Sequence, residues 1–238
     1  MVTGNQKKGV IKLWLLLLVI GLLGCNNEEK APFYGSENPR QISYLALGDS
    51  YTIGQSVCTT CRFPEQLKTS LQASYPNSPF LLQVIAKTGW TTTNLLTEIN
   101  LVNPSTEFDL VTLLIGVNNQ FQNKPFSIYE TEFPQLVNKA IVFAKGDKTN
   151  VIVVSIPDYA YTPFGQGAVN ISTGIDQYNA FAQNYCTENG IAFVNITDIT
   201  RLGLAQPELV ADNLHPSELA YSKFVERISP LALTAIAN

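Results

Sequence analysis

Residues 42–50 (ISYLALGDS) join a short apolar run to a polar turn that contains Gly48, Asp49 and Ser50. An aliphatic and aromatic run closed by glycine is typical of a buried β-strand. A serine directly after such a strand stands at the carboxyl edge of the sheet, where α/β proteins place their functional groups. This stretch therefore predicts a central strand and a candidate functional residue, Ser50.

Four further apolar runs follow, and they alternate with helical patterns. The runs occupy residues 80–86, 110–116, 151–156 and 191–196, and the helical patterns lie near residues 64–74, 91–101, 128–145, 176–189 and 217–237. Nearly continuous apolar strands separated by helices indicate a parallel sheet that is covered on both faces. We therefore expect residues 42–238 to form one α/β domain, a three-layer α/β/α sandwich around a five-stranded parallel sheet of the flavodoxin-like kind.

The composition excludes several classes of protein. The chain has 238 residues, of which 45% are hydrophobic and 14% charged, so it is too apolar for a disordered chain. The net charge is −4 and the longest basic run is Lys7–Lys8, which argues against a nucleic-acid partner. Because His215 is the only histidine, a metal site built from several histidines is excluded, and we expect no metal and no cofactor.

The first 24 residues have the pattern of an export signal. Three lysines precede an apolar run over residues 13–24, which is too short to span a bilayer comfortably. The run ends in LLGC and resembles a bacterial lipobox, in which the cysteine, here Cys25, is lipidated after cleavage before it. The alternative is an ordinary signal or anchor with a chance cysteine. We predict a lipoprotein signal peptide (1–24), a lipidated cysteine with a flexible tether (25–41), and attachment by lipid to a membrane of the bacterial cell envelope.

Polar residues also follow the second and third predicted strands. Gly89 precedes a helix start, where an unhindered backbone N–H suits an anion, although a plain turn uses the same residue. Asn118 follows the third strand, and its amide either donates a hydrogen bond at the sheet edge or closes a turn.

The single histidine has a carboxylate three residues before it. In a loop, the spacing of Asp212 and His215 lets the carboxylate accept from one ring nitrogen while the other faces a serine. This arrangement fixes the tautomer of the imidazole and stabilises its charged form, as a hydrolytic base requires.

The surroundings of Ser50 do not fit the G-x-S-x-G elbow, because Thr52 stands where the second glycine belongs.

In chain order, these four places resemble the serine, glycine, asparagine and histidine blocks of the SGNH, or GDSL-type, hydrolases. The resemblance covers residues 42–237 and rests on the segments GDS (48–50), Gly89, GVN (116–118) and DNLH (212–215). Two positions depart from the family pattern, because Tyr51 replaces the leucine of GDSL and Asn119 replaces a common aspartate.

The resemblance implies a serine esterase or acyl hydrolase that works through an acyl-enzyme. Ser50 is then the nucleophile, His215 the base and Asp212 the group that orients it. The Ser50 N–H, the Gly89 N–H and the Asn118 side-chain amide form the oxyanion hole. Asp49 is expected to be structural.

The substrate implied by the resemblance is a small-molecule, glycan or lipid ester. The alternative function is a catalytically silent surface lipoprotein that binds a glycan or lipid with the same fold. Loops 120–127 and 158–174 are candidates for the substrate pocket. The aromatic residues of the second loop stack on a sugar, line an apolar slot or pack the loop itself; they are Tyr159, Tyr161 and Phe164.

Three cysteines remain besides Cys25. Cys58 and Cys61 have a C-x-x-C spacing, which in an exported protein favours a local disulfide over free thiols or a metal site. Cys186 falls in a predicted helix and is expected to be a small buried residue.

Overall fold

The computed structural model describes residues 40–237. The predicted signal peptide (1–24), Cys25 and the tether up to residue 39 lie outside this range. The lipoprotein assignment therefore stays a prediction from the sequence.

The domain is built on one parallel sheet of five strands in the order β2-β1-β3-β4-β5. This order is the flavodoxin-like one, so the predicted five-stranded doubly wound sheet is confirmed. The central strand β1 is aligned with both neighbours, and its Ala46 pairs with Val84 and Thr112. The strands are β1 (Ile42–Gly48), β2 (Phe80–Ala86), β3 (Leu110–Leu114), β4 (Val151–Val154) and β5 (Ala192–Val194).

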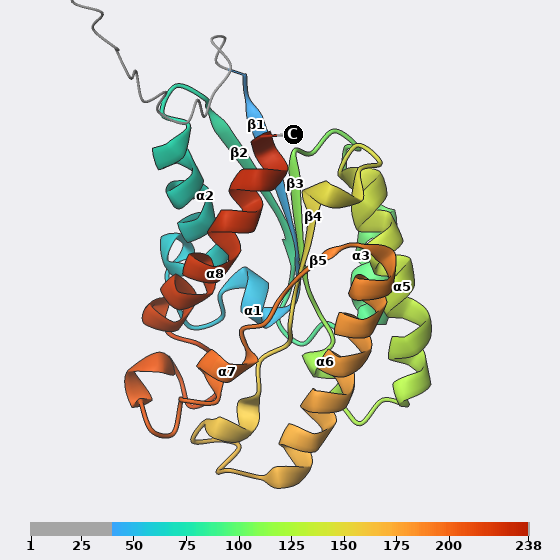
Figure 1. Cartoon of the computed structure of the whole chain (residues 1–238). Helices are drawn as coiled ribbons and strands as arrows, with labels where there is room; N and C mark the ends of the chain where they lie inside the picture. Colours follow the sequence, from blue (N-terminus) through green and yellow to red (C-terminus); the bar gives the residue numbers. More distant parts are fainter. Residues whose placement is uncertain (1–39, 238) are drawn as a thin grey trace, which may run out of the picture. The chain divides into compact units, whose positions relative to one another are not determined.

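Helices cover both faces of the sheet, which gives the predicted three layers (Figure 1). One face is covered by α2 (Phe63–Ser74) and α8 (Glu218–Ala237), and the other by α3 (Thr92–Val102), α5 (Phe126–Phe143) and α6 (Val169–Asn189). In α2 the fully buried Phe63, Leu67 and Leu71 recur every four residues, which places them on one stripe toward the sheet. With both faces covered, the open positions for a site are the strand ends.

The strands β3, β4 and β5 are shorter than predicted, because the chain bends away from the sheet before each apolar run ends. After β3 the chain passes through Gly116 (φ 128°) directly into a short helix. Short elements of this kind follow several strands. Hydrophobic periodicity does not reveal them, because a single helical turn is too short to show a period. They are α1 (Ser50–Ile53), α4 (Val117–Phe121), α7 (Thr197–Thr200) and the 3₁₀ turns η1 (Thr59–Cys61), η2 (Lys148–Asn150), η3 (Tyr159–Tyr161) and η4 (Pro207–Leu209).

The prediction that residues 158–174 form a loop is wrong in its second half, because α6 begins at Val169 rather than near residue 176. Residues 169–174 (VNISTG) have low helix propensity, so their sequence argues for a loop. Tertiary packing overrides this preference. Ile171 packs against the core, Ile175 is fully buried, and Gly174 lies so close to Gln120 that a side chain there would clash.

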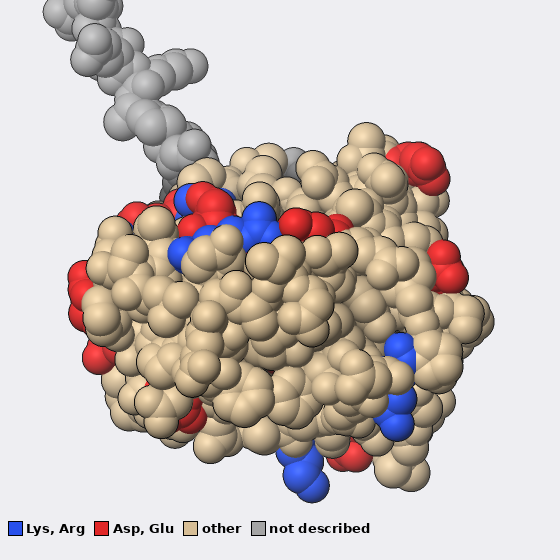
Figure 2. Space-filling view, turned by 90° about the horizontal axis from the view of Figure 1, so that it is seen from below, with Lys and Arg blue, Asp and Glu red and all other residues tan. Residues whose placement is uncertain are grey.

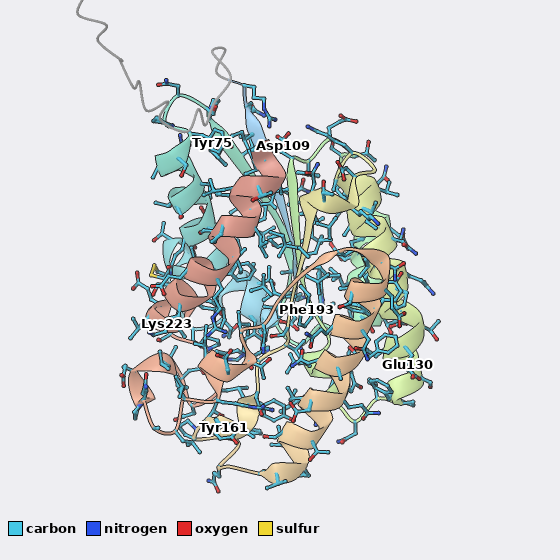
Figure 3. All side chains as sticks on the ribbon, in the orientation of Figure 1. Tyr75, Asp109, Glu130, Tyr161, Phe193 and Lys223 are labelled. Atoms are coloured by element: carbon cyan, nitrogen blue, oxygen red, sulfur yellow. A yellow bond between two sulfur atoms is a disulfide. The ribbon has the colours of Figure 1, made fainter. Side chains whose placement is uncertain are left out.

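The two edges of the sheet differ in chemistry. At the amino edge, Asp109 binds the side chains of Arg40 and Lys145 and the N–H of Ser43, and Figure 3 shows it at the upper end of the domain. Tyr161 lies at the lower end, which holds the carboxyl ends of the strands. Figure 2 looks onto this lower face, where charged side chains gather mainly toward the rim.

Candidate active site

Ser50 is the first residue of α1, directly after the end of the central strand β1. Asp49 caps this helix, since its Oδ1 accepts the N–H of Tyr51 at 3.0 Å. Glycine is required at position 48, because a Cβ there would clash with the Leu114 carbonyl oxygen of β3. The sharp strand-to-helix passage therefore holds Ser50 at the carboxyl edge of the sheet.

A pocket of about 180 Å³ opens beside Ser50. It brings together four of the residues that the sequence singled out, namely Ser50, Gly89, Asn118 and His215. The remaining lining residues carry no charge and are mostly apolar: Tyr51, Thr88, Val117, Phe121, Tyr159 and Leu214. Three strand-end segments and the loop before α8, far apart in the sequence, thus converge on one uncharged cavity.

His215 is held against this pocket by Asp212. The Nδ1 atom of His215 lies 2.9 Å from Oδ2 of Asp212, as the D-x-x-H spacing predicts. The backbone N–H groups of Leu214 and His215 donate to Oδ1 of the same carboxylate at 3.0 and 2.8 Å. Because Nδ1 is engaged by a carboxylate, Nε2 is the nitrogen left for chemistry in the pocket.

Asp212 remains ionised under ordinary conditions. Partial burial acts to raise the pKa of its carboxyl, but hydrogen bonds from the His215 N–H, the Ser56 hydroxyl and the His215 ring outweigh it and hold the pKa below its usual range. The Ser56 hydroxyl donates to Oδ2 of Asp212, and Ser56 itself has a left-handed backbone (φ 68°). Sequence reasoning missed Ser56, because nothing local connects it with a carboxylate 156 residues further on.

Within residues 40–237, no hydrogen bond joins Ser50 Oγ to the His215 ring, although both line the same pocket. In substrate-free sites such contacts are often long, and they tighten when substrate binds. The structure therefore places a serine and an oriented imidazole on one cavity, without a direct hydrogen bond between the two side chains.

Gly89 and Asn118 lie on the side of the pocket formed by the loop after β2 and by α4. Gly89 has φ 83° and belongs to a turn that the Trp90 N–H closes on the Lys87 carbonyl at 3.2 Å. The Asn118 amide donates to the Trp90 carbonyl at 3.1 Å, and its second N–H remains for a ligand. Gln122, which the sequence analysis did not single out, donates to the Gly89 carbonyl at 2.9 Å.

Asn119 has a structural task. Its Oδ1 accepts the Thr92 N–H at 2.9 Å, and its Nδ2 lies 2.7 Å from the Thr92 hydroxyl oxygen. The side chain is fully buried and joins α4 to the first residue of α3. The position that departs from the common aspartate therefore lies outside the lining of the pocket.

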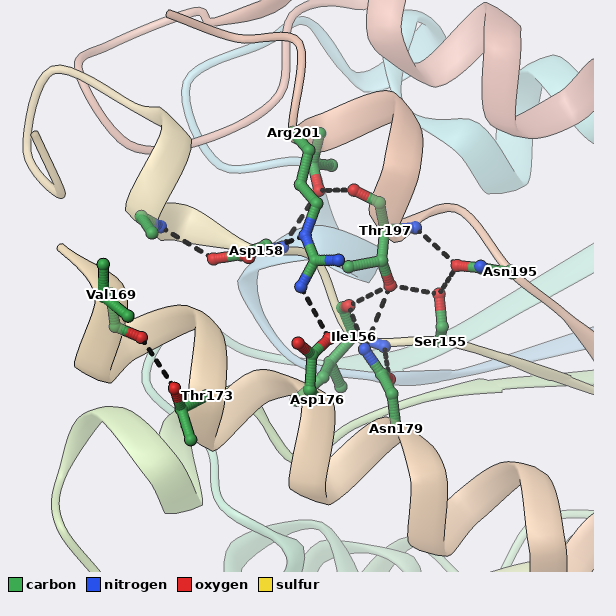
Figure 4. Close-up of polar contacts among 12 residues, drawn as sticks. Ser155, Ile156, Asp158, Val169, Thr173, Asp176, Asn179, Asn195, Thr197 and Arg201 are labelled. Atoms are coloured by element: carbon green, nitrogen blue, oxygen red, sulfur yellow. Dashed lines mark hydrogen bonds and ion pairs between the residues drawn. The ribbon is translucent and has the colours of Figure 1, made fainter. Parts of the chain in front are cut away.

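Of the three aromatic residues in the predicted pocket loop, Tyr159 borders the cavity, whereas Tyr161 and Phe164 are not among its lining residues. The start of this loop is held by Asp158, whose buried carboxylate binds Arg201 Nε at 2.9 Å and the Ala160 N–H at 3.0 Å (Figure 4). Arg201 also binds Asp176 of α6 at 2.6 Å. A network outside the pocket thus fixes the position of Tyr159.

Tyr51 is a second tyrosine that lines the pocket. The ring of Tyr51 lies 5.5 Å from the ring of His215 between centroids, and the tyrosine is almost fully buried. Where the family pattern has leucine, this chain thus has an aromatic ring beside the imidazole.

The structure joins Cys58 and Cys61 by a disulfide that closes the loop after α1. Cys186 is free and buried in α6, and burial raises the pKa of its thiol to about 12.

Among the described residues 40–237, no cluster of three or more histidine, cysteine or acidic side chains is arranged to hold a metal ion. No helix in that range has the length and apolarity needed to cross a membrane.

The architecture and the strand-end site define an α/β hydrolytic enzyme of the SGNH type. The model of the GDSL-like lipase/acylhydrolase family matches residues 46–223, which is most of the chain. The chain belongs to this family and is a serine hydrolase that acts on esters. The curated proteins contain no match to the sequence.

Several solved structures share the fold at low sequence identity. The lipase/acylhydrolase from Enterococcus faecalis aligns with a TM-score of 0.64 at 18% identity over 82% of this chain and 96% of its own. A variant of the acetyl xylan esterase Axe2 from Geobacillus stearothermophilus gives 0.62 at 18% over 82% and 95%. The esterase EstA from Pseudoalteromonas, in a structure inhibited by monoethylphosphonate, gives 0.62 at 15% over 82% and 99%. These likenesses confirm the SGNH hydrolase fold predicted from the sequence.

Proposed function

We propose that Ser50 is the nucleophile of this ester hydrolase and His215 its general base. Serine attacks a carbonyl at neutral pH only when a base takes its proton. The Oγ of Ser50 forms a bond to the acyl carbon while its proton moves to Nε2 of His215. Asp212, fixed on Nδ1, stabilises the imidazolium that results.

The developing negative charge on the carbonyl oxygen meets three donors, the Ser50 N–H, the Gly89 N–H and the Asn118 amide. When the tetrahedral intermediate collapses, the ester C–O bond breaks and His215 gives its proton to the departing alcohol. Water then attacks the acyl-enzyme with the same base, which releases the carboxylic acid and restores Ser50.

The observation that carries this proposal is the 2.9 Å contact between Asp212 and His215, the only histidine of the chain. His215 lines the same cavity as Ser50, Gly89 and Asn118. A binding module has no need for a carboxylate that fixes one imidazole tautomer beside a serine. The same contact supports the enzymatic function over the silent binding alternative.

The test is hydrolysis of p-nitrophenyl acetate by the purified domain and by Ser50→Ala. We expect Ser50→Ala to lose at least about a thousandfold in kcat, since the nucleophile is removed, with melting unchanged. Ser105→Ala, which changes an exposed serine in the loop before β3, is the matched control and should keep full activity. Labelling by an organophosphonate at a serine other than Ser50 would show that the nucleophile is misassigned.

We further propose that the chain is a lipoprotein of the bacterial cell envelope, attached to a membrane through Cys25. The basic segment, the short apolar run and the LLGC sequence support this assignment. The substrate is a small-molecule, glycan or lipid ester that reaches the enzyme at the envelope, and the uncharged lining of the pocket favours a neutral one.

A further inference from the structure

The pocket beside Ser50 combines two kinds of lining residue. One kind comprises the groups that the proposed mechanism uses, Ser50, Gly89, Asn118 and His215. The other includes Val117, Phe121, Tyr159 and Leu214, here called the apolar wall, and none of the lining residues is an acid, a lysine or an arginine. A wall of this kind favours an uncharged aliphatic group.

Phe121 lies about one helical turn from the proposed oxyanion donor Asn118. His215 gives its proton to the departing alcohol, so the alcohol lies next to His215. The acyl carbonyl oxygen lies against Asn118, and Phe121 follows Asn118 by three residues in α4. Residues three apart share one face of a helix, so Phe121 is the wall residue next to the expected position of the acyl carbonyl.

The two aromatic residues of this wall differ in how firmly they are held. Tyr159 is 5% exposed, and its hydroxyl donates to Gln120 Oε1 at 2.7 Å. Phe121 is 43% exposed, and it contacts the rings of Tyr159 and Phe164 at centroid distances of 5.6 and 5.8 Å. Phe164 is 55% exposed and lies behind Phe121, because it touches that ring without lining the pocket.

The size of the cavity limits what it can hold. Its volume of about 180 Å³ lies below the range of about 300–1,000 Å³ in which drug-sized ligands bind. A short acyl chain fits, whereas a longer one has to pass the Phe121 ring.

We propose that Phe121, supported by Phe164, sets the acyl-chain length that this hydrolase accepts and restricts it to short aliphatic acyl groups. This inference rests on the proposed function of Ser50. Removal of the Phe121 ring opens the cavity toward Phe164 and extends the apolar wall. Each additional methylene group that the wall then buries is expected to raise kcat/KM about fourfold relative to the parent enzyme.

The experiment compares kcat/KM over p-nitrophenyl acetate, butyrate, hexanoate, octanoate and decanoate for the parent, Phe121→Ala, Phe121→Leu and Phe164→Ala. We expect the parent to prefer the shortest members. Phe121→Ala should raise the ratio of octanoate to acetate at least tenfold, with Phe121→Leu and Phe164→Ala intermediate. Leu101→Ala, which truncates a 75% exposed residue of α3, is the control and should leave the profile unchanged.

A second series keeps the acyl group as acetate and lengthens the alcohol from methyl to hexyl. Phe121→Ala should leave the dependence of kcat/KM on alcohol length unchanged. A change in this dependence would mean that Phe121 contacts the alcohol, and it would overturn the inference. An acyl profile parallel to that of the parent would overturn it too. If no variant hydrolyses any ester in a Ser50-dependent way, the proposed function fails, which is a separate outcome. Melting curves exclude unfolding, and Phe121→Leu keeps the test open if Phe121→Ala is unstable.

Discussion

The side-chain amide of Gln122 donates a hydrogen bond of 2.9 Å to the carbonyl oxygen of Gly89. Gly89 is the third residue of the turn 87–90, and of the two central residues only Gly89 has a positive φ. This combination defines a type II turn. In a type I turn the peptide between Thr88 and Gly89 is turned over, so a carbonyl oxygen replaces the Gly89 N–H. The turn type therefore decides whether this position offers a donor or an acceptor to an oxyanion.

We predict that Gly89→Ala lowers kcat about a hundredfold or more, although the new methyl group meets no heavy atom within 4 Å. Alanine disfavours φ 83° and favours a type I turn, which removes one oxyanion donor. The measurement is kcat and KM for p-nitrophenyl acetate. Gly146→Ala is the matched control, because Gly146 has φ 75° and equally open surroundings but lies in the turn after α5. An equal loss of activity in both variants would contradict the role of Gly89.

The contact between Ser56 and Asp212 gives a second prediction. Ser56→Ala should lower kcat about two- to tenfold, the usual effect of one hydrogen bond, without a change in KM. Asp212→Ala should lower kcat far more, because His215 loses the acceptor for its Nδ1–H. If Ser56 acts only through Asp212, Ser56→Ala should have no further effect in the Asp212→Ala background. An undiminished effect of Ser56→Ala there would show that the serine acts by another route.

The sheet, the three layers and the positions of Ser50, Gly89, Asn118 and His215 could be predicted because each rests on a local pattern. A buried strand is visible as an apolar run, and the polar residue that follows it is then placed at the sheet edge. The contact of Asp212 with His215 is also local, since three residues separate them.

The supporting contacts could not be predicted, because they join loops that only the fold brings together. Ser56 reaches Asp212 across 156 residues, and Gln122 reaches Gly89 from the end of α4. The early start of α6 has the same origin, since Ile171 and Ile175 are held by the core against the weak helix propensity of their segment. Phe121 belongs to the segment 120–127 that was predicted as a pocket loop, but its place in α4, three residues after Asn118, is seen only in the structure.

The lipoprotein proposal predicts the behaviour of the full-length precursor in a bacterial host. Cys25→Ser should leave the precursor uncleaved, and therefore larger on a gel, and should block attachment of the lipid. Several acyl chains give stable membrane attachment, so the parent should enter the detergent phase on partitioning. Asn26→Ser, which changes the next residue, should behave like the parent. A parent protein that stays in the aqueous phase would refute lipidation at Cys25.

The last prediction concerns Asp49, which caps α1 beside Ser50. Its side chain is fully buried, and in the part of the chain that the structure describes its Oδ2 has no hydrogen-bond partner. Burial raises the pKa of this carboxyl from 3.8 to about 7. A raised pKa means that the folded protein holds the proton more tightly than the unfolded chain does. The stability that Asp49 contributes is therefore complete below about pH 4 and is lost as the pH rises through about 7.

Asp49→Asn separates this effect from all other titrations, because asparagine keeps an acceptor for the Tyr51 N–H but does not ionise. We expect the free energy of unfolding of Asp49→Asn, relative to the parent, to rise between about pH 4 and about pH 7 by at most about 1.4 kcal/mol per pH unit. Above about pH 7 the difference should be constant. Urea titrations across this range measure it. Asp147→Asn is the control, because hydrogen bonds from Thr149 lower the pKa of Asp147. The free energy of unfolding of Asp147→Asn, relative to the parent, should therefore change only at acid pH, and there it should fall as the pH rises. A difference for Asp49→Asn that does not vary with pH would mean that the carboxyl is ionised in the folded protein throughout, and that the cap at α1 carries a buried charge.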